Sequence, residues 1–292
     1  MEARNRMAEQ GNPIAVQDAA VAVHPSYWRV FGTFARNSLV RDMTFRSNFL
    51  IECITSVLWM AMNLGYYLLI YEFTGSIAGW TRFEFFIFLA TTLFVNSIVQ
   101  ALFMPNCEEF SELIRTGGLD FALLKPIDTQ FLISLNKINW SSFANFLFAA
   151  GLMGFSVWNL PEPPGVIQML LFPLYIACGV AILYALMISL AATSVWLGRN
   201  QTLYDFWFYI TNFSRYPMEI YTGTIGSPLQ WLFTFIIPVL IVVNVPARLL
   251  AKPLEAQNWP LAVFALVAAA GSLWAARWVF SRAMLSYRSA SS

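Results

Sequence analysis

Five stretches of this chain are long and apolar enough to cross a lipid bilayer as helices. A membrane-spanning helix needs about 20 mostly apolar residues, because the hydrocarbon core of a bilayer is about 30 Å thick. The 292 residues have the matching composition, with 58% hydrophobic and 11% charged residues. The sequence therefore predicts an all-α integral membrane protein. The predicted spans are 49–71, 84–105, 136–158, 168–196 and 259–281.

Residues 201–246 hold two shorter apolar pieces separated by SRYPMEIYTGTIGS. In our prediction the chain crosses at 201–216, and 218–246, broken by Pro238, dips into the outer leaflet and returns as a re-entrant segment. The sequence leaves an alternative open, in which 228–246 is the fifth crossing and 201–216 lies flat on the inner face. Both arrangements give six crossings.

Arginines near both ends of the apolar region set the expected topology. Segments rich in Lys and Arg close to membrane spans face the cytoplasm. Both chain ends are therefore expected in the cytoplasm, which requires an even number of crossings, and with six of them Arg115, Lys125 and Arg199 face the cytoplasm too. The arginines near the ends are Arg4, Arg6, Arg29, Arg36, Arg41 and Arg46 before the first span, and Arg277, Arg282 and Arg288 at the end of the last.

The segment ahead of the first span predicts an amphipathic helix lying along the inner membrane surface. Trp28 and Phe31 recur at helical spacing, and Arg29 and Arg36 lie one heptad apart on another face. The predicted organisation is thus a disordered tail at 1–24, an interface helix at 25–48 and one six-span domain at 49–292.

A charged block, residues 106–137, separates the second and third predicted spans. Phe110, Leu113 and Ile114 fall at helical spacing on one face, while charged residues occupy the other positions, which predicts a short amphipathic helix. An apolar face inside a charged loop is typical of a surface that inserts into a groove of a partner protein. The charged residues of this helix are Glu108, Glu109, Glu112 and Arg115.

The second half of the block predicts a sharp bend and another short element. The glycine pair 117–118 should stop the first helix, because glycine readily adopts a left-handed backbone. A second apolar piece, 119–124, ends at Lys125 and Pro126. Asp128 is then placed to cap the helix that becomes span three.

Few residues could support catalysis or metal binding. His24 is the single histidine, so an HExxH zinc site cannot form, and a Ser/His or Cys/His pair would have to recruit it from outside the membrane. The cysteines, Cys53, Cys107 and Cys178, are scattered and are interpreted as packing residues. A net charge of +1 argues against nucleic-acid binding. The sequence contains no GxxxxGK[ST] phosphate loop, so ATP is not expected to be hydrolysed by this chain.

Two stretches carry a resemblance to a known family. IRTGGLDFALLKPID resembles the I-x-x-G-x-L-D-x-x-L-L-K-P signature between the second and third spans of type-2 ATP-binding cassette (ABC) permeases. RYPMEIY and FIIPVLIVVNVPARLL resemble a second recurring region of the same family, and the resemblance covers nearly the whole chain. The first match falls on Ile114, Gly117, Leu119, Asp120, Leu123, Leu124, Lys125 and Pro126, and the second on Arg215, Tyr216, Pro217, Pro238, Pro246, Ala247, Leu249 and Leu250.

The resemblance implies a permease subunit of an ATP-driven exporter in the bacterial plasma membrane. In this family two permease chains, identical or paralogous, pair in the membrane, and each docks a separate nucleotide-binding ATPase subunit. ATP and Mg²⁺ are then expected in the ATPase, and this chain would hold no cofactor, metal or catalytic residue. Membrane lipid is a further expected partner and nucleic acid is not. The family suggests a lipid-like or amphiphilic substrate, but no residue identifies it.

The resemblance also assigns roles to three groups of residues. The ATPase-coupling group comprises Glu108, Glu109, Glu112, Leu113, Arg115, Gly117, Gly118, Leu119, Asp120, Lys125 and Pro126. The re-entrant segment and outer gate include Arg215, Pro217, Glu219, Pro238 and Pro246, with a gate pair between Arg215 and Glu219 or a purely structural role as the two options. The interface helix includes Trp28, Arg29, Phe31 and Arg36.

The alternative from another class is a secondary carrier or channel that needs no ATPase. It would require activity of the purified chain alone and an essential ionisable residue at membrane depth. The predicted spans contain no run of acidic residues or histidines that would suit such a carrier.

Overall fold

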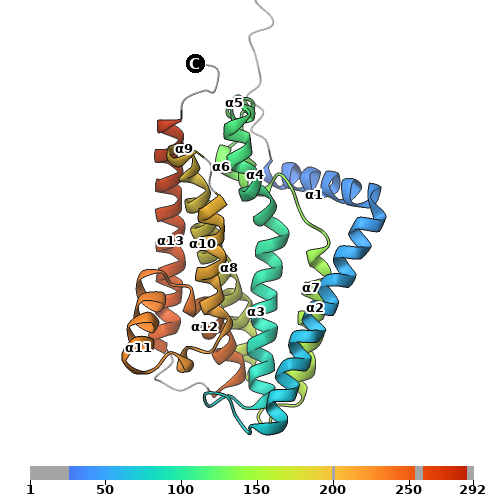
Figure 1. Cartoon of the computed structure of the whole chain (residues 1–292), viewed down its shortest axis with the longest axis vertical. Helices are drawn as coiled ribbons and strands as arrows, with labels where there is room; N and C mark the ends of the chain where they lie inside the picture. The colour runs from blue at the N-terminus through green and yellow to red at the C-terminus, as the bar shows by residue number, and fades with distance from the viewer. Residues whose placement is uncertain (1–25, 199–200, 254–258, 288–292) are drawn as a thin grey trace, which may run out of the picture.

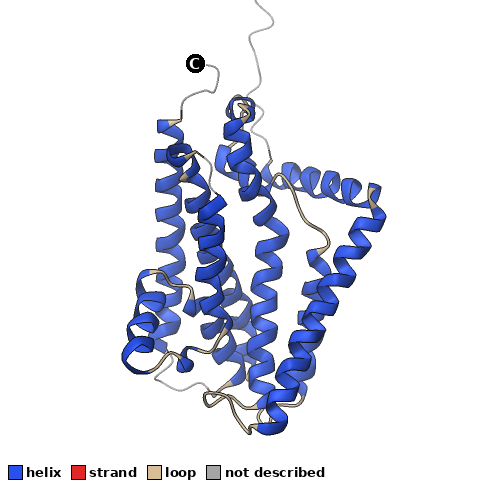
Figure 2. Ribbon diagram, in the orientation of Figure 1, coloured by secondary structure: helices blue, strands red, loops and turns tan. Residues whose placement is uncertain are grey.

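The computed structural model shows an all-helical chain (Figure 2), which confirms the predicted class. The described residues form no β-strand, and a single isolated β-bridge among them joins Ile77 and Trp80. The described residues are 26–198, 201–253 and 259–287, without the side chains of 201–204, 206 and 207, so the predicted tail at 1–24 lies outside them, as do Arg4, Arg6, Arg199 and Arg288.

Four helices in the described part of the chain are long and apolar enough to cross a membrane by themselves. Two of them are continued by a short helix after a slight break. They are α2 (Arg46–Phe73), α3 (Arg82–Leu102) with α4 (Met104–Arg115), α8 (Val166–Ala192) with α9 (Ser194–Leu197), and α13 (Trp259–Ser286).

The remaining predicted crossings are shorter or bent. Helix α7 (Ser142–Trp158) has 17 residues, and α10 (Gln201–Asn212) has 12. At 1.5 Å per residue, α10 rises only about 18 Å, less than the bilayer core. Helix α11 (Gly223–Trp231) continues as a π-helical turn, Leu232–Ile236. Together they form a pair with α12 (Leu240–Ala251) that is bent by 90°, with Pro238 in the break. Length and composition thus support four or five spans, and six crossings remain a prediction.

Three helices have bounds that differ from those of the predicted segments. Helix α1 (Tyr27–Thr44) ends before residue 48, and the bent pair continues beyond 246. Span three does not begin at 136, because Asp128 caps the separate helix α6 (Thr129–Leu135), and α7 starts only at Ser142. Between these two helices, the backbone N–H groups of Lys137 and Ile138 bond side chains of α4 and α1 instead of continuing a helix.

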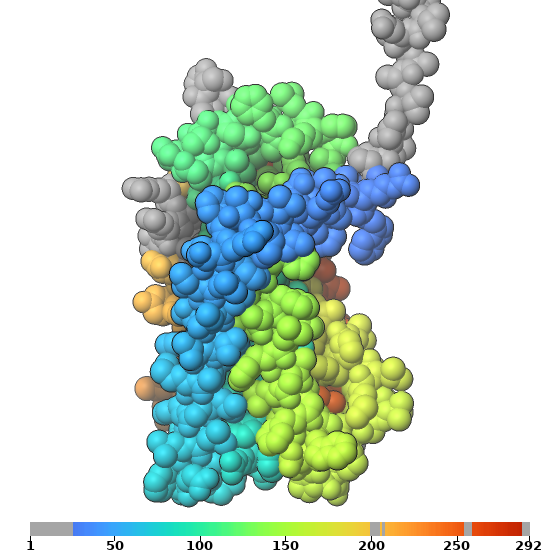
Figure 3. All heavy atoms as spheres, turned by 90° about the vertical axis from the view of Figure 1, so that its right-hand side faces the viewer, coloured from blue at the N-terminus to red at the C-terminus, as the bar shows by residue number. Residues whose placement is uncertain are grey.

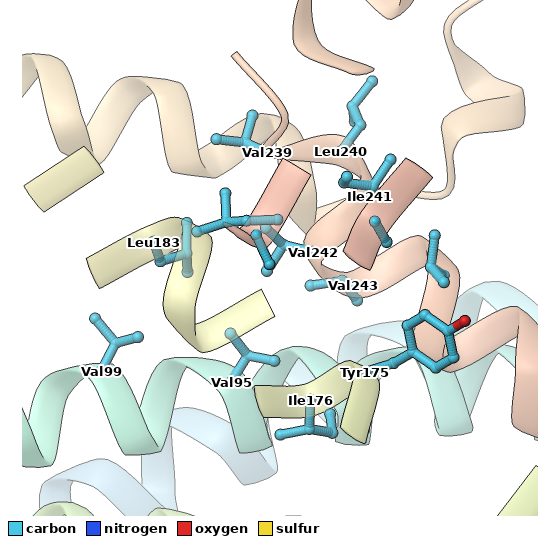
Figure 4. Close-up of a cluster of buried hydrophobic side chains, with 14 of the residues drawn as sticks. Val95, Val99, Tyr175, Ile176, Leu183, Val239, Leu240, Ile241, Val242 and Val243 are labelled. Carbon is cyan, nitrogen blue, oxygen red and sulfur yellow. The ribbon is translucent and has the colours of Figure 1, made fainter. Parts of the chain in front are cut away.

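The core gathers around α8, which packs against α12 and α13. On the neighbouring side, α3 packs against α12, α8 and α7. Figure 4 shows Val95 and Val99 of α3 near Leu183 of α8 and Val242 of α12, all four of them buried. Helix α2 differs, because only 6% of its apolar window is buried, so most of its surface is left for lipid or another subunit.

Gly179 sets how closely α8 and α12 approach. A Cβ atom at this position would lie 2.7 Å from the carbonyl oxygen of Val242. We expect Gly179→Ala to destabilise the chain by about 1–3 kcal/mol, because the helices must move apart. The matched control is Gly154→Ala on α7, where a new Cβ atom would have no other atom within 4 Å. This variant should be neutral or stabilising, because alanine has a better helix propensity than glycine. Thermal unfolding in detergent measures both, and equal stabilities would contradict the close contact.

One end of the bundle holds the start of α1, helices α4 to α6 and the end of α13 (Figure 1). Figure 3 shows α1 lying across the end of α2 and α7, with the α4–α6 block above it. Ring contacts join these parts: Tyr27 lies 4.9 Å from Phe131, and Phe110 lies 6.0 Å from Phe280, between centroids. The N-terminus of α1 and the C-terminus of α13 thus lie at the same end of the bundle. An even number of crossings requires this arrangement.

Candidate functional site

The charged block forms three short helices at this end: α4, α5 (Gly118–Leu123) and α6. Gly117 has a φ of +73° and separates α4 from α5, as the predicted bend requires. Gly118 does not share this role, because it is already the first residue of α5. The Asp128 carboxylate accepts a hydrogen bond of 2.9 Å from the backbone N–H of Phe131 and so caps α6.

Helix α4 is amphipathic and turns its apolar side to the bundle. Phe110 is fully buried against Phe280 of α13, while Leu113 and Ile114 are half-buried. The acidic residues lie on the other side, and two of them have partners within the chain. Glu109 pairs with Lys137 at 2.6 Å, and Glu112 pairs with Arg115 at 2.5 Å. Glu108 is exposed on the same side.

Asn106 fastens α4 to the segment that precedes α7. Its amide nitrogen donates to the carbonyl of Lys137 at 2.7 Å, and its amide oxygen accepts from the Lys137 N–H at 2.8 Å. The same segment reaches α1, because the Ile138 N–H donates to Ser38 Oγ and the Trp140 indole N–H donates to the Ala35 carbonyl. Reasoning from sequence missed Asn106, whose one signal was a polar side chain at the end of an apolar span.

Helix α6 is fastened to the bundle by polar contacts. The Arg277 guanidinium of α13 donates to Asp128 at 2.7 Å and to the Gln130 side chain at 3.0 Å. Burial opposes ionisation of Asp128, but the hydrogen bonds from Arg277 and the Phe131 N–H hold its pKa below the usual value. The Tyr184 hydroxyl of α8 bonds the side chains of Gln130 and Ser134. These contacts join α6 to α8 and α13.

Helix α5 presents an apolar surface to the outside. Leu119 is fully buried beneath it, and Asp120 is half-buried in its first turn. Phe121 is 72% exposed and Leu124 is 81% exposed. We call Phe121, Leu123 and Leu124 the α5 ridge, which is flanked by exposed Lys125 and Pro126.

The predicted outer-gate residues lie at the opposite end of the bundle. Glu219 pairs with Arg248 of α12 instead of with Arg215, and it also accepts a hydrogen bond of 3.3 Å from the Trp80 indole. The Arg215 guanidinium lies 5.7 Å from the centre of the Phe208 ring. In this structure the fold thus brings Arg248, and not Arg215, to the Glu219 carboxylate, and a gate role for these residues stays a prediction.

Two of the three prolines predicted for this region lie at its breaks. Pro217 lies between the 3-10 turn Phe213–Arg215 and a second one, Met218–Ile220, of which it is the N-cap. Pro238 lies at the 90° bend, whereas Pro246 lies inside α12.

The predicted interface-helix residues lie along α1. Trp28 is 85% exposed, Arg29 and Arg36 are exposed, and Phe31 is half-buried. The helix leaves the bundle sideways (Figure 1), as a helix at a membrane surface would.

Apolar helices long enough to span a bilayer, joined at one end by a charged block, define a multi-pass membrane protein. A family model described as ABC-2 family transporter protein matches residues 57–291. The chain belongs to this family, which confirms the resemblance to type-2 ABC permeases, and it is an ABC transporter membrane subunit. Comparison with curated proteins and with solved structures gave no match.

Proposed function

We propose that this chain is the permease subunit of an ATP-driven exporter of the bacterial plasma membrane. Two such chains would form the path for an amphiphilic substrate, and each would dock a separate ATPase subunit that binds ATP and Mg²⁺. The chain would move substrate and catalyse no covalent step.

The observation that carries this proposal is the α5 ridge together with the polar contacts that hold the α4–α6 block on the bundle. Exposed aromatic and aliphatic side chains beside charges are typical of the centre of a protein–protein interface. The ridge stands on a block held by Asn106, Asp128 and Tyr184, so a push on the ridge would move α3, α8 and α13 rather than bend a loose loop. A connection of this kind could transmit ATP-driven motion to membrane helices.

Copurification tests the proposal. The chain, extracted from its native membrane in mild detergent, is expected to bring down a soluble protein with a phosphate loop, encoded by a neighbouring gene. Extraction at high salt serves as a control, because an apolar interface should survive it while a purely electrostatic one is screened. Recovery of an active chain with no ATPase would favour the carrier or channel alternative.

Labelling of a single cysteine is expected to decide the topology. In a background without Cys53, Cys107 and Cys178, Ser227→Cys on α11 should react with a membrane-impermeant maleimide from outside intact cells. Residue 227 is exposed, and the 90° bend after α11 supports a re-entrant segment. The matched control is Thr116→Cys, in the exposed turn after α4, which should react only after the membrane is opened. Reaction at residue 227 from the cytoplasmic side alone would favour 228–246 as the fifth crossing.

A further inference from the structure

Three polar side chains come together where α2 passes close to the 3-10 turn Phe213–Arg215, in the half of the bundle away from α4–α6. The Tyr67 hydroxyl of α2 lies within electrostatic range of the Arg215 guanidinium and of the Tyr216 hydroxyl. Arg215 is exposed, Tyr216 is 45% exposed, and Tyr67 is half-buried against the Phe85 ring, with 4.7 Å between centroids. We call Tyr67, Arg215 and Tyr216 the outer polar cluster.

The polar tips of this cluster have no hydrogen-bond partner among the described residues. Two other tyrosines at the same end differ from them. The Tyr71 hydroxyl donates to the Trp80 carbonyl at 3.0 Å, and the Tyr221 hydroxyl donates to the Phe213 carbonyl at 2.9 Å. Because unmade hydrogen bonds at membrane depth are costly, polar tips that the described chain leaves unpaired indicate a place for a ligand or for water.

The charge of Arg215 is not balanced by an acid in the described part of the chain. Asp205, the acid of α10, lies ten residues earlier, which is about 15 Å along a helix. Glu219 follows four residues later but pairs with Arg248. Glu255 lies outside the described residues, so the experiment includes its replacement.

The length of α2 indicates the depth of the cluster in a membrane. The 28 residues of α2 rise about 42 Å, so a bilayer core of about 30 Å centred on the helix leaves about 6 Å outside at each end. Tyr67 lies about 9 Å along the axis from the last residue, Phe73. The cluster therefore lies close to the outer boundary of the core, where the head group of an amphiphile meets its apolar part.

We infer that the outer polar cluster binds the anionic head group, a phosphate or a carboxylate, of the transported amphiphile. A guanidinium is a preferred partner of such oxygens, and phenol hydroxyls add further hydrogen bonds. The apolar part of the molecule would lie deeper along α10, on the rings of Phe208 and Tyr209, which are 48% and 66% exposed. The inference rests on the proposed function, because it names the class of molecule that the permease would move.

Binding to the purified full-length chain in maltoside detergent tests the cluster without the ATPase. The two probes carry the same fluorescent dodecyl chain, one with a phosphate head group and the other with a trimethylammonium head group. Fluorescence anisotropy measures the affinity of each. We expect the phosphate probe to bind about tenfold more tightly or more. Equal affinities would show a plain apolar surface and would overturn the inference.

Transport distinguishes a substrate from a resident lipid at the same cluster. In proteoliposomes with the ATPase and ATP, we expect faster transport of the phosphate probe than of the ammonium probe, and Arg215→Gln should remove this preference. A preference that Arg215→Gln leaves unchanged would overturn the role of the cluster in substrate binding. Absence of ATP-dependent transport of both probes would instead contradict the proposed function, and binding in detergent would still decide whether the cluster takes an anion.

Variants locate the site. Arg215→Gln should weaken binding of the phosphate probe about tenfold. Arg82→Gln, at the same end but paired with Glu72 at 3.8 Å, should leave it unchanged. If Arg215→Gln does not fold, Tyr216→Phe keeps the ring, removes one hydroxyl and should weaken binding by a smaller factor. Glu255→Gln should have no effect, and tighter binding would show that Glu255 neutralises Arg215 and would overturn the inference. Equal affinity of the Arg215 and Arg82 variants would overturn it as well.

Discussion

Phe121→Glu combined with Leu124→Glu is expected to abolish docking of the ATPase. These side chains are 72% and 81% exposed, so their replacement should change the stability of the free permease little. At an interface they would instead bury two carboxylates in an apolar groove, and hot-spot residues each contribute about 2 kcal/mol or more. We expect at least about a hundredfold weaker binding of the ATPase to the purified permease, measured by surface plasmon resonance.

The matched control is Leu285→Glu, at the same end of the bundle but on the last turn of α13. Leu285 is also 81% exposed, so the change adds a similar charge to a similar surface. Its effect on ATPase binding should be small. Equal losses for the α5 ridge and for Leu285 would argue against the ridge as the docking surface.

Reversing the acidic residues of α4 is a less specific test. Glu109 is paired with Lys137, and Glu112 with Arg115, so arginine at these positions would place like charges together inside the permease. A loss of ATPase binding could then come either from a destabilised α4 or from a changed interface, and the experiment would not separate the two causes. The structure therefore favours the α5 ridge for this experiment.

Asn106→Leu is expected to destabilise the permease strongly. Leucine has a similar size but leaves both the N–H and the C=O of Lys137 without their partner. At about 1–3 kcal/mol for each group left unsatisfied, the loss for the two part-buried groups should be about 2–6 kcal/mol. Thermal unfolding in detergent measures it, and cysteine accessibility at residue 138 reports whether the segment before α7 has come loose from α1.

Asn63→Leu provides the control for Asn106→Leu. Among the described residues, the hydrogen bond of the Asn63 side chain goes to the Trp59 carbonyl of its own helix, at 2.8 Å. Its replacement should therefore cost about 0.6 kcal/mol or less. If the two leucine variants have similar stability, Asn106 does not fasten α4 to the rest of the chain.

The long helices could be predicted from sequence because their cause is local. About 20 apolar residues in a row can satisfy their backbone in lipid only as a helix, and this condition places α2, α3, α8 and α13. The bend at Gly117 and the cap at Asp128 were likewise local signals. The ABC-2 family followed from a motif with fixed spacing.

The boundaries and pairs that sequence reasoning missed depend on distant residues. Lys137 and Ile138 leave the helical path because side chains from α4 and α1 bind their backbone. Arg215 is closer to Glu219 in the sequence, but Glu219 pairs with Arg248, because the bent pair folds back and brings α12 to the carboxylate. The sequence pattern identified an apolar piece at 119–124, but which of its side chains face outward depends on how α5 lies on α4.

Flux across proteoliposomes tests the central claim most directly. The purified chain is reconstituted alone, and a fluorescent amphiphile is followed across the bilayer with and without the soluble ATPase and ATP. We expect flux only when the ATPase and ATP are both present, and none with the Phe121→Glu, Leu124→Glu variant. Flux through the chain alone, unchanged by the ATPase and ATP, would contradict the claim that a separate ATPase drives this permease.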